Sequence, residues 1–271
     1  MSELLLETRD DVMQDRRTIV FWQYAVTEKA PILDPELFEC IWLDDPASML
    51  LIERLDKTRP CIFFVSLQAR RVLEKTGFHP IISDTPFMFC PSYILASIPE
   101  YMLSPDMSFL PLGRVAKMPE TLPEEFFIRP DSGAKTFPGQ VLRRDDIPQF
   151  IATYKSISPY DSVAIAQPRT IVSEVRVFLD TASGTIITSS SYKHADQNQN
   201  TPDYEVNDEL KNLVFKVGQS LFNAGIAEIV VADFALTLDD GPKLIELNSV
   251  STSGIYNASI KDIVEAIMIY L

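Results

Sequence analysis

The chain has 271 residues, of which 46% are hydrophobic and 23% charged, as in an ordinary folded globular protein. Its formal net charge of −14 argues against a broad basic surface, so no nucleic-acid partner is expected. Three widely spaced cysteines in apolar surroundings and only two histidines favour reduced thiols in a cytoplasmic protein and argue against zinc. The first residues are too charged for a signal peptide, and no apolar run approaches the roughly 18 residues of a membrane span, so no membrane partner is expected.

Residues 17–95 alternate apolar runs with helical patterns, which predicts an N-terminal α/β lobe. The strand candidates in this lobe are residues 18–24, 61–65 and 81–82. Ser66 is suited to cap a helix that Gly77 ends. No pattern here carries chemistry, so the lobe is either purely structural or forms one wall of a substrate cleft.

The rest of the chain predicts two further groups of strands and helices. Residues 98–125, rich in Pro and Met, predict an extended linker. Strands are expected at 126–130, 140–144, 162–167, 173–179, 184–191, 229–237 and 243–249. Helices are expected at 145–156, at 209–223 and from Ser259 onward, with a surface loop over 193–208.

The last two predicted strands carry acidic and amide groups where a buried strand should be apolar. Glu246 and Asn248 share one face, about 7 Å apart. A hairpin centred on Asp240-Gly241 places Asp233 opposite Asn248 and diagonal to Glu246. Such an all-oxygen cluster suits Mg²⁺, which keeps water and leans on substrate phosphates. The same pattern also fits three solvated residues on an exposed sheet face.

A second feature is the loop DSGAKTFP, which follows a strand ending in Arg129. Small residues and Lys135 suit a loop that folds over a polyphosphate, with backbone N–H groups as donors. A plain surface hairpin fits the same residues.

A third feature is the strand SEVRVFL, on which Glu174 and Arg176 share one face. Arg176 is suited to stabilise charge that develops on a transferred phosphoryl group or a tetrahedral intermediate, and Glu174 to bind a ribose hydroxyl. Lys193 ends the next strand and adds a positive charge. A cross-strand ion pair and a solvated lysine are the structural alternatives.

The order of these features resembles the ATP-grasp superfamily over roughly residues 100–271. The segments FIRPDSGAKTFPGQ, SEVRVFLD, VADFALT and LIELNSVSTSGIY carry the resemblance. The pattern looks closest to a small divergent clade of bacterial and phage proteins. That clade has an Arg-Pro-Asp strand end, a Lys-x-Phe-x-Gly loop and a Glu-Leu-Asn-Ser…Gly-x-Tyr ending.

The resemblance implies an α/β (α+β) protein with the ATP-grasp fold, in which two α+β lobes clasp ATP after a smaller N-terminal α/β lobe. The expected divisions are residues 1–100 for the N-terminal lobe, 101–168 for the lobe with the phosphate loop, and 169–271 for the lobe with the metal-binding hairpin.

The resemblance also assigns roles to single residues. Asp233, Glu246 and Asn248 would hold one or two Mg²⁺ ions that bridge ATP phosphates. ATP contacts would come from Arg129, Lys135, Gln167, Glu174 and Lys193, with Gln167 at the hinge strand near adenine and Glu174 on ribose. Lys135 and Arg176 would be catalytic, Arg176 lying near the γ-phosphate and the acyl group. Ser251, Ser253, Gly254 and Tyr256 would line the acceptor side.

Two positions depart from the resemblance. The upstream phosphate lysine of many relatives has only Arg114 and Lys117 as candidates, and Gln167-Pro168 replaces an acidic pair at the hinge. The expected activity is that of an ATP- and Mg²⁺-dependent carboxylate–amine ligase acting through an acyl phosphate on a small molecule or peptide.

A phosphotransferase on the same fold and a nucleotide-binding module without turnover are the alternatives to a ligase. Oligomeric state is not indicated. Replacing Asp233 or Glu246 by alanine is expected to stop turnover with little change in melting temperature.

Overall fold

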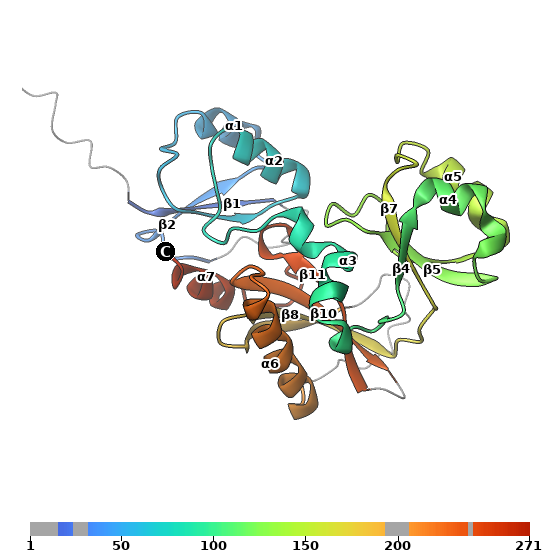
Figure 1. The fold of residues 1–271 in the computed structure, drawn as a ribbon. Helices are drawn as coiled ribbons and strands as arrows, with labels where there is room; N and C mark the ends of the chain where they lie inside the picture. Colours follow the sequence, from blue (N-terminus) through green and yellow to red (C-terminus); the bar gives the residue numbers. More distant parts are fainter. Residues whose placement is uncertain (1–15, 24–31, 193–205, 238–240) are drawn as a thin grey trace, which may run out of the picture.

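The structure is a computed structural model that describes residues 16–23, 32–192, 206–237 and 241–271. Its strands form three sheets, with the orders β2-β1-β3, β4-β7-β5-β6 and β11-β10-β8-β9. The first sheet is parallel and the other two are antiparallel in all their pairings. Helices accompany each sheet (Figure 1), so the architecture is the mixed α and β type that the sequence predicts.

The N-terminal sheet is buried on both faces. Its elements are β1 (Thr18–Trp22), β2 (Phe38–Trp42), β3 (Cys61–Phe64), α1 (Pro46–Ile52) and α2 (Leu67–Lys75). Because side chains alternate along a strand, Ile19 and Phe21 enter a core beneath α2. Val20 and Trp22 enter a larger core that is shared with the third sheet. This double burial explains the unbroken apolar run of β1.

Local signals in this lobe are partly confirmed. Ser66 caps α2 by accepting a hydrogen bond from the Ala69 N–H at 3.2 Å, and Gly77 follows the helix with φ +99°. The predicted strand at 81–82 is wrong: only an isolated bridge joins Pro80 to Cys61. Strand β2 was not predicted, because Glu39 interrupts its apolar run. Helix α1 was not predicted either.

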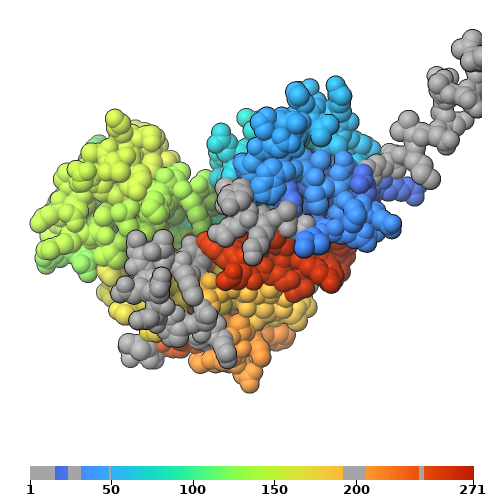
Figure 2. All heavy atoms as spheres, turned by 180° about the vertical axis from the view of Figure 1, so that it is seen from behind, coloured from blue at the N-terminus to red at the C-terminus, as the bar shows by residue number. Residues whose placement is uncertain are grey.

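The middle lobe has its own sheet and its own core. Its elements are β4 (Ser108–Pro111), α4 (Leu112–Lys117), β5 (Glu125–Pro130), β6 (Gln140–Arg143), α5 (Ile147–Thr153) and β7 (Ser162–Ala166). The core forms around Val115, Phe126, Phe137 and Phe150, separate from the other two cores. Figure 2 shows this lobe projecting to one side of the body that the rest of the chain forms.

The expectation of an extended linker over 98–125 is wrong. That stretch contains β4, α4 and two 3-10 turns that begin at Pro99 and Pro119. Proline favours the first position of a helical turn but breaks longer helices. The stretch is therefore divided into short ordered pieces, of a kind that periodicity over a long window does not detect.

The third sheet carries helices on one face. Its elements are β8 (Ser173–Asp180), β9 (Thr185–Tyr192), β10 (Ile229–Thr237) and β11 (Gly241–Ser249), with α3 (Pro91–Ser97), α6 (Asp208–Asn223) and α7 (Ile260–Met268). Helix α6 packs on the face that bears Leu179, since a Cβ added to Gly218 would come within 3.4 Å of Leu179 Cδ1. Residue Arg176 lies on the opposite face, three positions away from Leu179.

The first and third sheets share one continuous core, which includes Val20 and Phe64 from the N-terminal lobe and Val177 and Leu247 from the third sheet. The Val65 N–H also donates to the Ser251 carbonyl at 3.0 Å. The proposed division of the chain at residues 100 and 168 stays a prediction. No helix among the described residues is long and apolar enough to cross a bilayer.

Candidate active site

The two predicted acids meet on β10 and β11 in a different register from the one expected. Asp233 lies directly opposite Glu246, and Asn248 is diagonal to it. The hairpin closes on the pair Thr237–Gly241, with Gly241 at φ +66°, and the register then shifts at Ile245. At these three residues the outcome differs from the prediction by two positions, which preserves the face of each of them. The three groups therefore still share one patch.

Asp233 is held by a buried arginine. Arg176 donates from Nε to Asp233 Oδ1 and from Nη2 to Oδ2, both at 2.8 Å, and the two side chains are each 5% exposed. The third guanidinium nitrogen, Nη1, donates to the Gly254 carbonyl at 3.0 Å. This bidentate pair is the cross-strand ion pair that the sequence left open, but it is buried rather than solvated.

Glu246 is held by two cations from the middle lobe. Lys135 Nζ donates to Glu246 Oε1 at 2.6 Å, and Arg129 Nη2 forms an ion pair with Oε2. Arg129 Nη1 also donates to the Ile245 carbonyl at 3.5 Å. The shift in register at Ile245 is thus where the middle lobe contacts β11. The predicted phosphate-loop cations lie on the same patch as the predicted metal ligands.

The donor set fits a hard divalent cation. Asn248 Nδ2 donates to Asp233 Oδ2 and to Glu246 Oε1, each at 3.1 Å, so both carboxylates converge on one amide. Rotation of that amide by about 180° would present Oδ1 instead and complete an all-oxygen set of the kind Mg²⁺ prefers. No three His, Cys, Asp or Glu residues of the described chain form a metal cluster, so the candidate set is two carboxylates and one amide.

Burial raises the pKa of both acids and nearby cations lower it, but burial prevails at Asp233 and the cations prevail at Glu246. Complete burial raises the pKa of Asp233 to about 6, although the Arg176 guanidinium opposes this rise. Burial also opposes ionisation of Glu246, but the Arg129 and Lys135 cations and the Asn248 hydrogen bond hold its pKa well below the ordinary range. The bidentate contact with Arg176 favours the ionised form of Asp233, and the two cations favour the ionised form of Glu246.

The loop after β5 is a hairpin that is tied to the N-terminal lobe. A Cβ at Gly133 would clash with the Pro86 carbonyl oxygen, so only glycine permits this approach. Asp131 Oδ1 accepts from the Ser92 N–H at 2.9 Å. Lys135 adopts φ +46°, an uncommon conformation for a residue with a side chain. The loop is thus a surface hairpin that also places Lys135 at the charge cluster, and the sequence allowed for both.

The other residues for which the sequence predicts ATP contacts lie away from the charge cluster or outside the described residues. Glu174 is two residues before Arg176 on the same face of β8, opposite Ala235. Gln167 follows β7, and its backbone N–H donates to Asp106 Oδ2 at 3.2 Å. Arg114 and Lys117 are exposed on α4, and Lys193 lies outside the described residues.

A pocket of about 270 Å³ opens beside Arg176 and Lys135. Three of the four residues predicted for the acceptor side line it: Ser253, Gly254 and Tyr256. The Tyr256 ring lies over the Arg176 guanidinium at 5.1 Å. Ser251 does not line the pocket; it is 1% exposed, and its carbonyl accepts from Val65. Its neighbour Thr252 lines the pocket instead.

The sequence left open that the N-terminal lobe forms one wall of a substrate cleft, but it did not identify the residues of the wall that this lobe contributes to the pocket. That wall comprises Leu67, Arg70, Asp84, Pro86 and Phe89. A signal was present, because helix α2 directly follows β3 of a parallel sheet. Ligands of such sheets commonly bind beyond the carboxyl ends of the strands.

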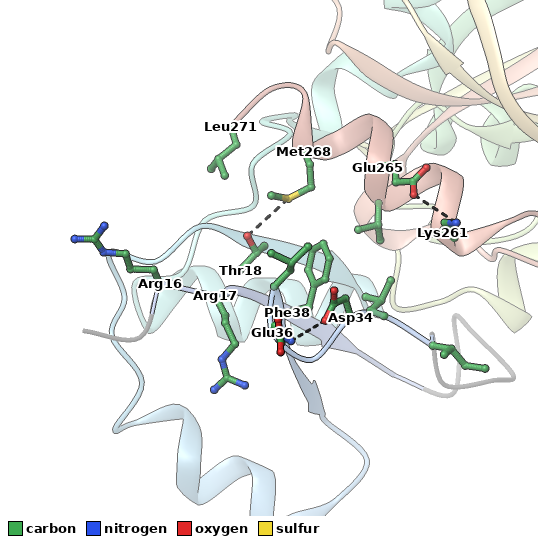
Figure 3. A pocket seen from close by; sticks show the side chains of 14 residues that line it. Arg16, Arg17, Thr18, Asp34, Glu36, Phe38, Lys261, Glu265, Met268 and Leu271 are labelled. Carbon is green, nitrogen blue, oxygen red and sulfur yellow. Dashed lines mark hydrogen bonds and ion pairs between the residues drawn. The ribbon is translucent and has the colours of Figure 1, made fainter. Parts of the chain in front are cut away.

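A larger groove of about 1380 Å³ lies elsewhere, between the N-terminal sheet and α7 (Figure 3). Its lining is mainly apolar, and two of its charged residues, Lys261 and Glu265, pair with each other at 3.8 Å. Size alone would favour this groove. The smaller pocket is the better candidate because it borders the buried charge cluster.

Comparison with known proteins shows the family and the fold of the chain. The family model that matches is described as an ATP-grasp domain, the second family of its clade, and it covers residues 109–266, more than half of the chain. A search among curated proteins found no match.

Several solved structures share the fold at low sequence identity. They include the VanG D-Ala:D-Ser ligase from Enterococcus faecalis (10% identity, TM-score 0.61, 95% of this chain and 100% of that one). A D-alanine–D-alanine ligase from Bacillus anthracis complexed with ATP has 16% identity and a TM-score of 0.56, over 93% and 92% of the two chains. The ATP-grasp ligase PsnB with its minimal precursor has 12% identity and a TM-score of 0.51, over 95% and 100%.

Proposed function

This chain belongs to the ATP-grasp domain family whose model it matches, and on that premise we propose that it is an ATP- and Mg²⁺-dependent carboxylate–amine ligase. The expected α+β ATP-grasp fold is the one observed, and the solved structures that share it include ligases. The substrates and the reaction intermediate are part of the proposal.

One observation carries the proposal. Three cations, Arg129, Lys135 and Arg176, neutralise the two carboxylates Asp233 and Glu246 at the junction of two lobes. A metal–polyphosphate complex carries both kinds of charge, so its phosphates would pair with the cations and its metal ion with the carboxylates. Phosphate oxygens would take Arg129 and Lys135, and the released Glu246 would join Asp233 and Asn248 as ligands of Mg²⁺. A site for an uncharged ligand would not require five buried or half-buried charges.

In the proposed reaction, an oxygen of the substrate carboxylate attacks the γ-phosphorus and the bond to ADP breaks, which gives an acyl phosphate. The amine nitrogen then attacks the acyl carbon, the amine loses a proton, and phosphate leaves. Lys135 and Arg129 would hold the phosphates in line for the first step, and Arg176 would offset the charge of the tetrahedral intermediate. Bound Mg²⁺ would supply Lewis-acid neutralisation of phosphate charge.

The nucleoside end would lie toward the hinge. Glu174 is about 7 Å from Arg176 along β8, on the same face. This spacing supports a contact with ribose. Gln167 begins the segment between the middle lobe and β8, which supports a role for its backbone at the adenine edge.

The products test the proposal. Purified protein with Mg-ATP is incubated with paired carboxylates and amines, and ADP, phosphate and amide are measured. A ligase yields all three in equal amounts. ADP without free phosphate, together with a phosphorylated acceptor, would establish a phosphotransferase instead. Calorimetric binding of Mg-ATP without formation of ADP under any pairing would establish a binding module.

A further inference from the structure

Resting on the nucleotide site proposed above, we infer that Asp131 is a positioning residue for Lys135. It clamps the loop that carries this lysine onto the body formed by the first and third sheets, and so places the lysine where the nucleotide phosphates would bind. Asp131 follows Arg129 by two residues but does not line the pocket. It would therefore act through Lys135 and not on a substrate.

The side chain and backbone of Asp131 join three pieces of the chain. Its Oδ1 accepts from the Ser92 N–H at 2.9 Å, at the start of α3. Its Oδ2 accepts from the Ser162 hydroxyl at 3.2 Å, and its own N–H donates to the Ser162 carbonyl at 3.0 Å, at the start of β7. One carboxylate thus links the end of β5 to its own lobe and to the body.

The start of α3 lacks a local acceptor for this N–H. Pro91 has no N–H, and Cys90, the N-cap residue, makes no capping hydrogen bond with its side chain. The Ser92 N–H is the first of the helix that needs a partner, and Asp131 supplies it from the other lobe. Because the acceptor is a carboxylate, this is a charge-assisted bond of the stronger kind.

The body side of the clamp is seated in the shared core. The 3-10 helix η1 (Pro86–Phe89) precedes α3, and Phe89 and Ile94 are both buried in that core. The same core holds Val250 of the 3-10 helix η5 (Val250–Thr252), which follows β11 and its candidate metal ligands. The clamp and the metal-ligand strand therefore belong to one packed unit.

The turn between the clamp and the lysine has hydrogen bonds of its own. The Ser132 hydroxyl accepts from the Ala134 N–H at 3.1 Å, and the Ser132 carbonyl accepts from the Lys135 N–H at 3.3 Å. Two residues after the lysine, Phe137 is buried in the core of the middle lobe. With both ends anchored, the turn fixes the backbone of Lys135 at the charge cluster while its side chain can still change partner.

A purely structural role for Asp131 predicts a different result. If it only capped α3, its loss would lower the stability of the protein and leave the contacts with ATP in place. Removal of a negative charge would by itself strengthen the binding of an anionic polyphosphate, since like charges repel. Weaker binding after this removal therefore reports the lost position of Lys135.

Isothermal titration with Mg-ATP tests the inference on the parent and three variants. Asp131→Ala should weaken binding about tenfold, because the charge-assisted bond that places Lys135 is lost. Asp131→Asn keeps Oδ1 as the acceptor for Ser92 and should recover most of the affinity. Asp161→Ala removes an exposed acid at the same end of the middle lobe and should not weaken binding. Thermal melts confirm that the variants are folded.

A double-variant cycle shows whether Asp131 acts through Lys135. In the Lys135→Ala background, Asp131→Ala should cost no further affinity for Mg-ATP, because the group that it positions is already gone. In the background of Lys155→Ala, an exposed lysine of the same lobe, the tenfold loss should persist. Without nucleotide, the Ser92 amide should exchange its hydrogen faster in Asp131→Ala than in the parent.

Each other outcome counts against a defined claim. Parent-like affinity of Asp131→Ala, an Asp131→Asn variant as weak as Asp131→Ala, or a further loss in the Lys135→Ala background overturns the inference and leaves the nucleotide site standing. Unchanged exchange at Ser92 also overturns it, because the contact is then not formed in solution. Absence of Mg-ATP binding by the parent overturns the proposed function and this inference together.

Discussion

Lys135 differs from the other two cations of the cluster in its exposure. Its side chain is 50% exposed, against 9% for Arg129 and 5% for Arg176. An exposed ion pair contributes little to stability, about 0–1 kcal/mol. Lys135 can therefore leave Glu246 at low cost when a phosphate offers a stronger partner, which suits a group that exchanges between two anions.

The first prediction concerns Lys135→Ala. Loss of a charge-assisted contact of about 1.5–3 kcal/mol should weaken Mg-ATP binding by roughly tenfold to a hundredfold. Isothermal titration measures the dissociation constant. Lys155→Ala, an exposed lysine of the same lobe, is the matched control and should bind Mg-ATP as the parent does. An unchanged constant for Lys135→Ala would remove this residue from the nucleotide site.

The structure changes the effect on stability that we expect when Asp233 is replaced. A solvated metal ligand could be removed with little effect on the melting temperature. The structure instead shows a buried, bidentate pair with Arg176, and loss of one partner leaves the other charge buried and unpaired. Removal of one partner of such a pair costs about 3–5 kcal/mol.

The second prediction is therefore that Asp233→Asn both stops turnover and lowers the free energy of unfolding by about 3–5 kcal/mol. Urea unfolding of this variant, of Arg176→Gln and of the double variant gives a complete mutant cycle. The double variant should lose much less than the sum of the two single losses. Additive losses would mean that the two side chains do not interact in solution.

Strand β11 serves two purposes along its length. Its middle carries Glu246 and Asn248, while its last residue, Ser249, bonds to Arg70 and Asp84 of the N-terminal lobe. Ser249 also caps η5 by accepting from the Ser251 N–H at 3.1 Å. The strand thus fixes the distance between the charge cluster and the pocket wall.

The third prediction is that Ser249→Ala lowers the free energy of unfolding by about 1–3 kcal/mol, because buried partners lose a hydrogen bond. Chemical denaturation measures this loss, and Ser156→Ala, an exposed serine of the middle lobe, should have no comparable effect. Parent-like stability would show that the network is not formed.

At the scale of the molecule, the middle lobe has a core of its own, while the first and third sheets share another. The middle lobe contacts the rest of the chain through the charge cluster and through the hairpin loop after β5. Units with separate cores open separately, and nucleotide should stabilise the lobe by bridging it to the body.

The fourth prediction concerns amide hydrogen exchange. Mg-ATP at about 100 times its dissociation constant stabilises the bound state by about 2.7 kcal/mol, so amides of β5 and β7 that exchange by lobe opening should slow about a hundredfold. Amides of α7, on the far side of the shared core, should slow far less. Equal slowing in all regions would mean that the chain opens as one unit.

The sequence predicted which side chains of the cluster share a face, but it missed several elements of the scaffold around them. The faces of Asp233, Glu246 and Asn248 follow from alternation alone, which a register error of two leaves intact. The pairing of Arg129 with Glu246 was beyond reach, because 117 residues separate the two and only the packing of lobes brings them together. The bulge at Ile245 has no local signature.

The same limit applies to the N-terminal wall. Leu67 and Arg70 read as ordinary positions of an amphipathic helix, and nothing local shows that η5 closes over them. Short elements that begin with proline were missed for a related reason, since their order depends on neighbours rather than on a periodic pattern.

The chain enters and leaves the middle lobe at one end of the third sheet. Met102 bridges to Leu244 on β11, and Ser173 pairs with Leu236 on β10. Three strand spacings of about 4.8 Å separate the two points, about 14 Å in all. Some six residues of flexible linker would span this gap. Segment 103–172 could therefore be replaced by such a linker. The remaining body would keep its continuous apolar core but would lose Arg129 and Lys135, the two cations that the middle lobe contributes to the charge cluster.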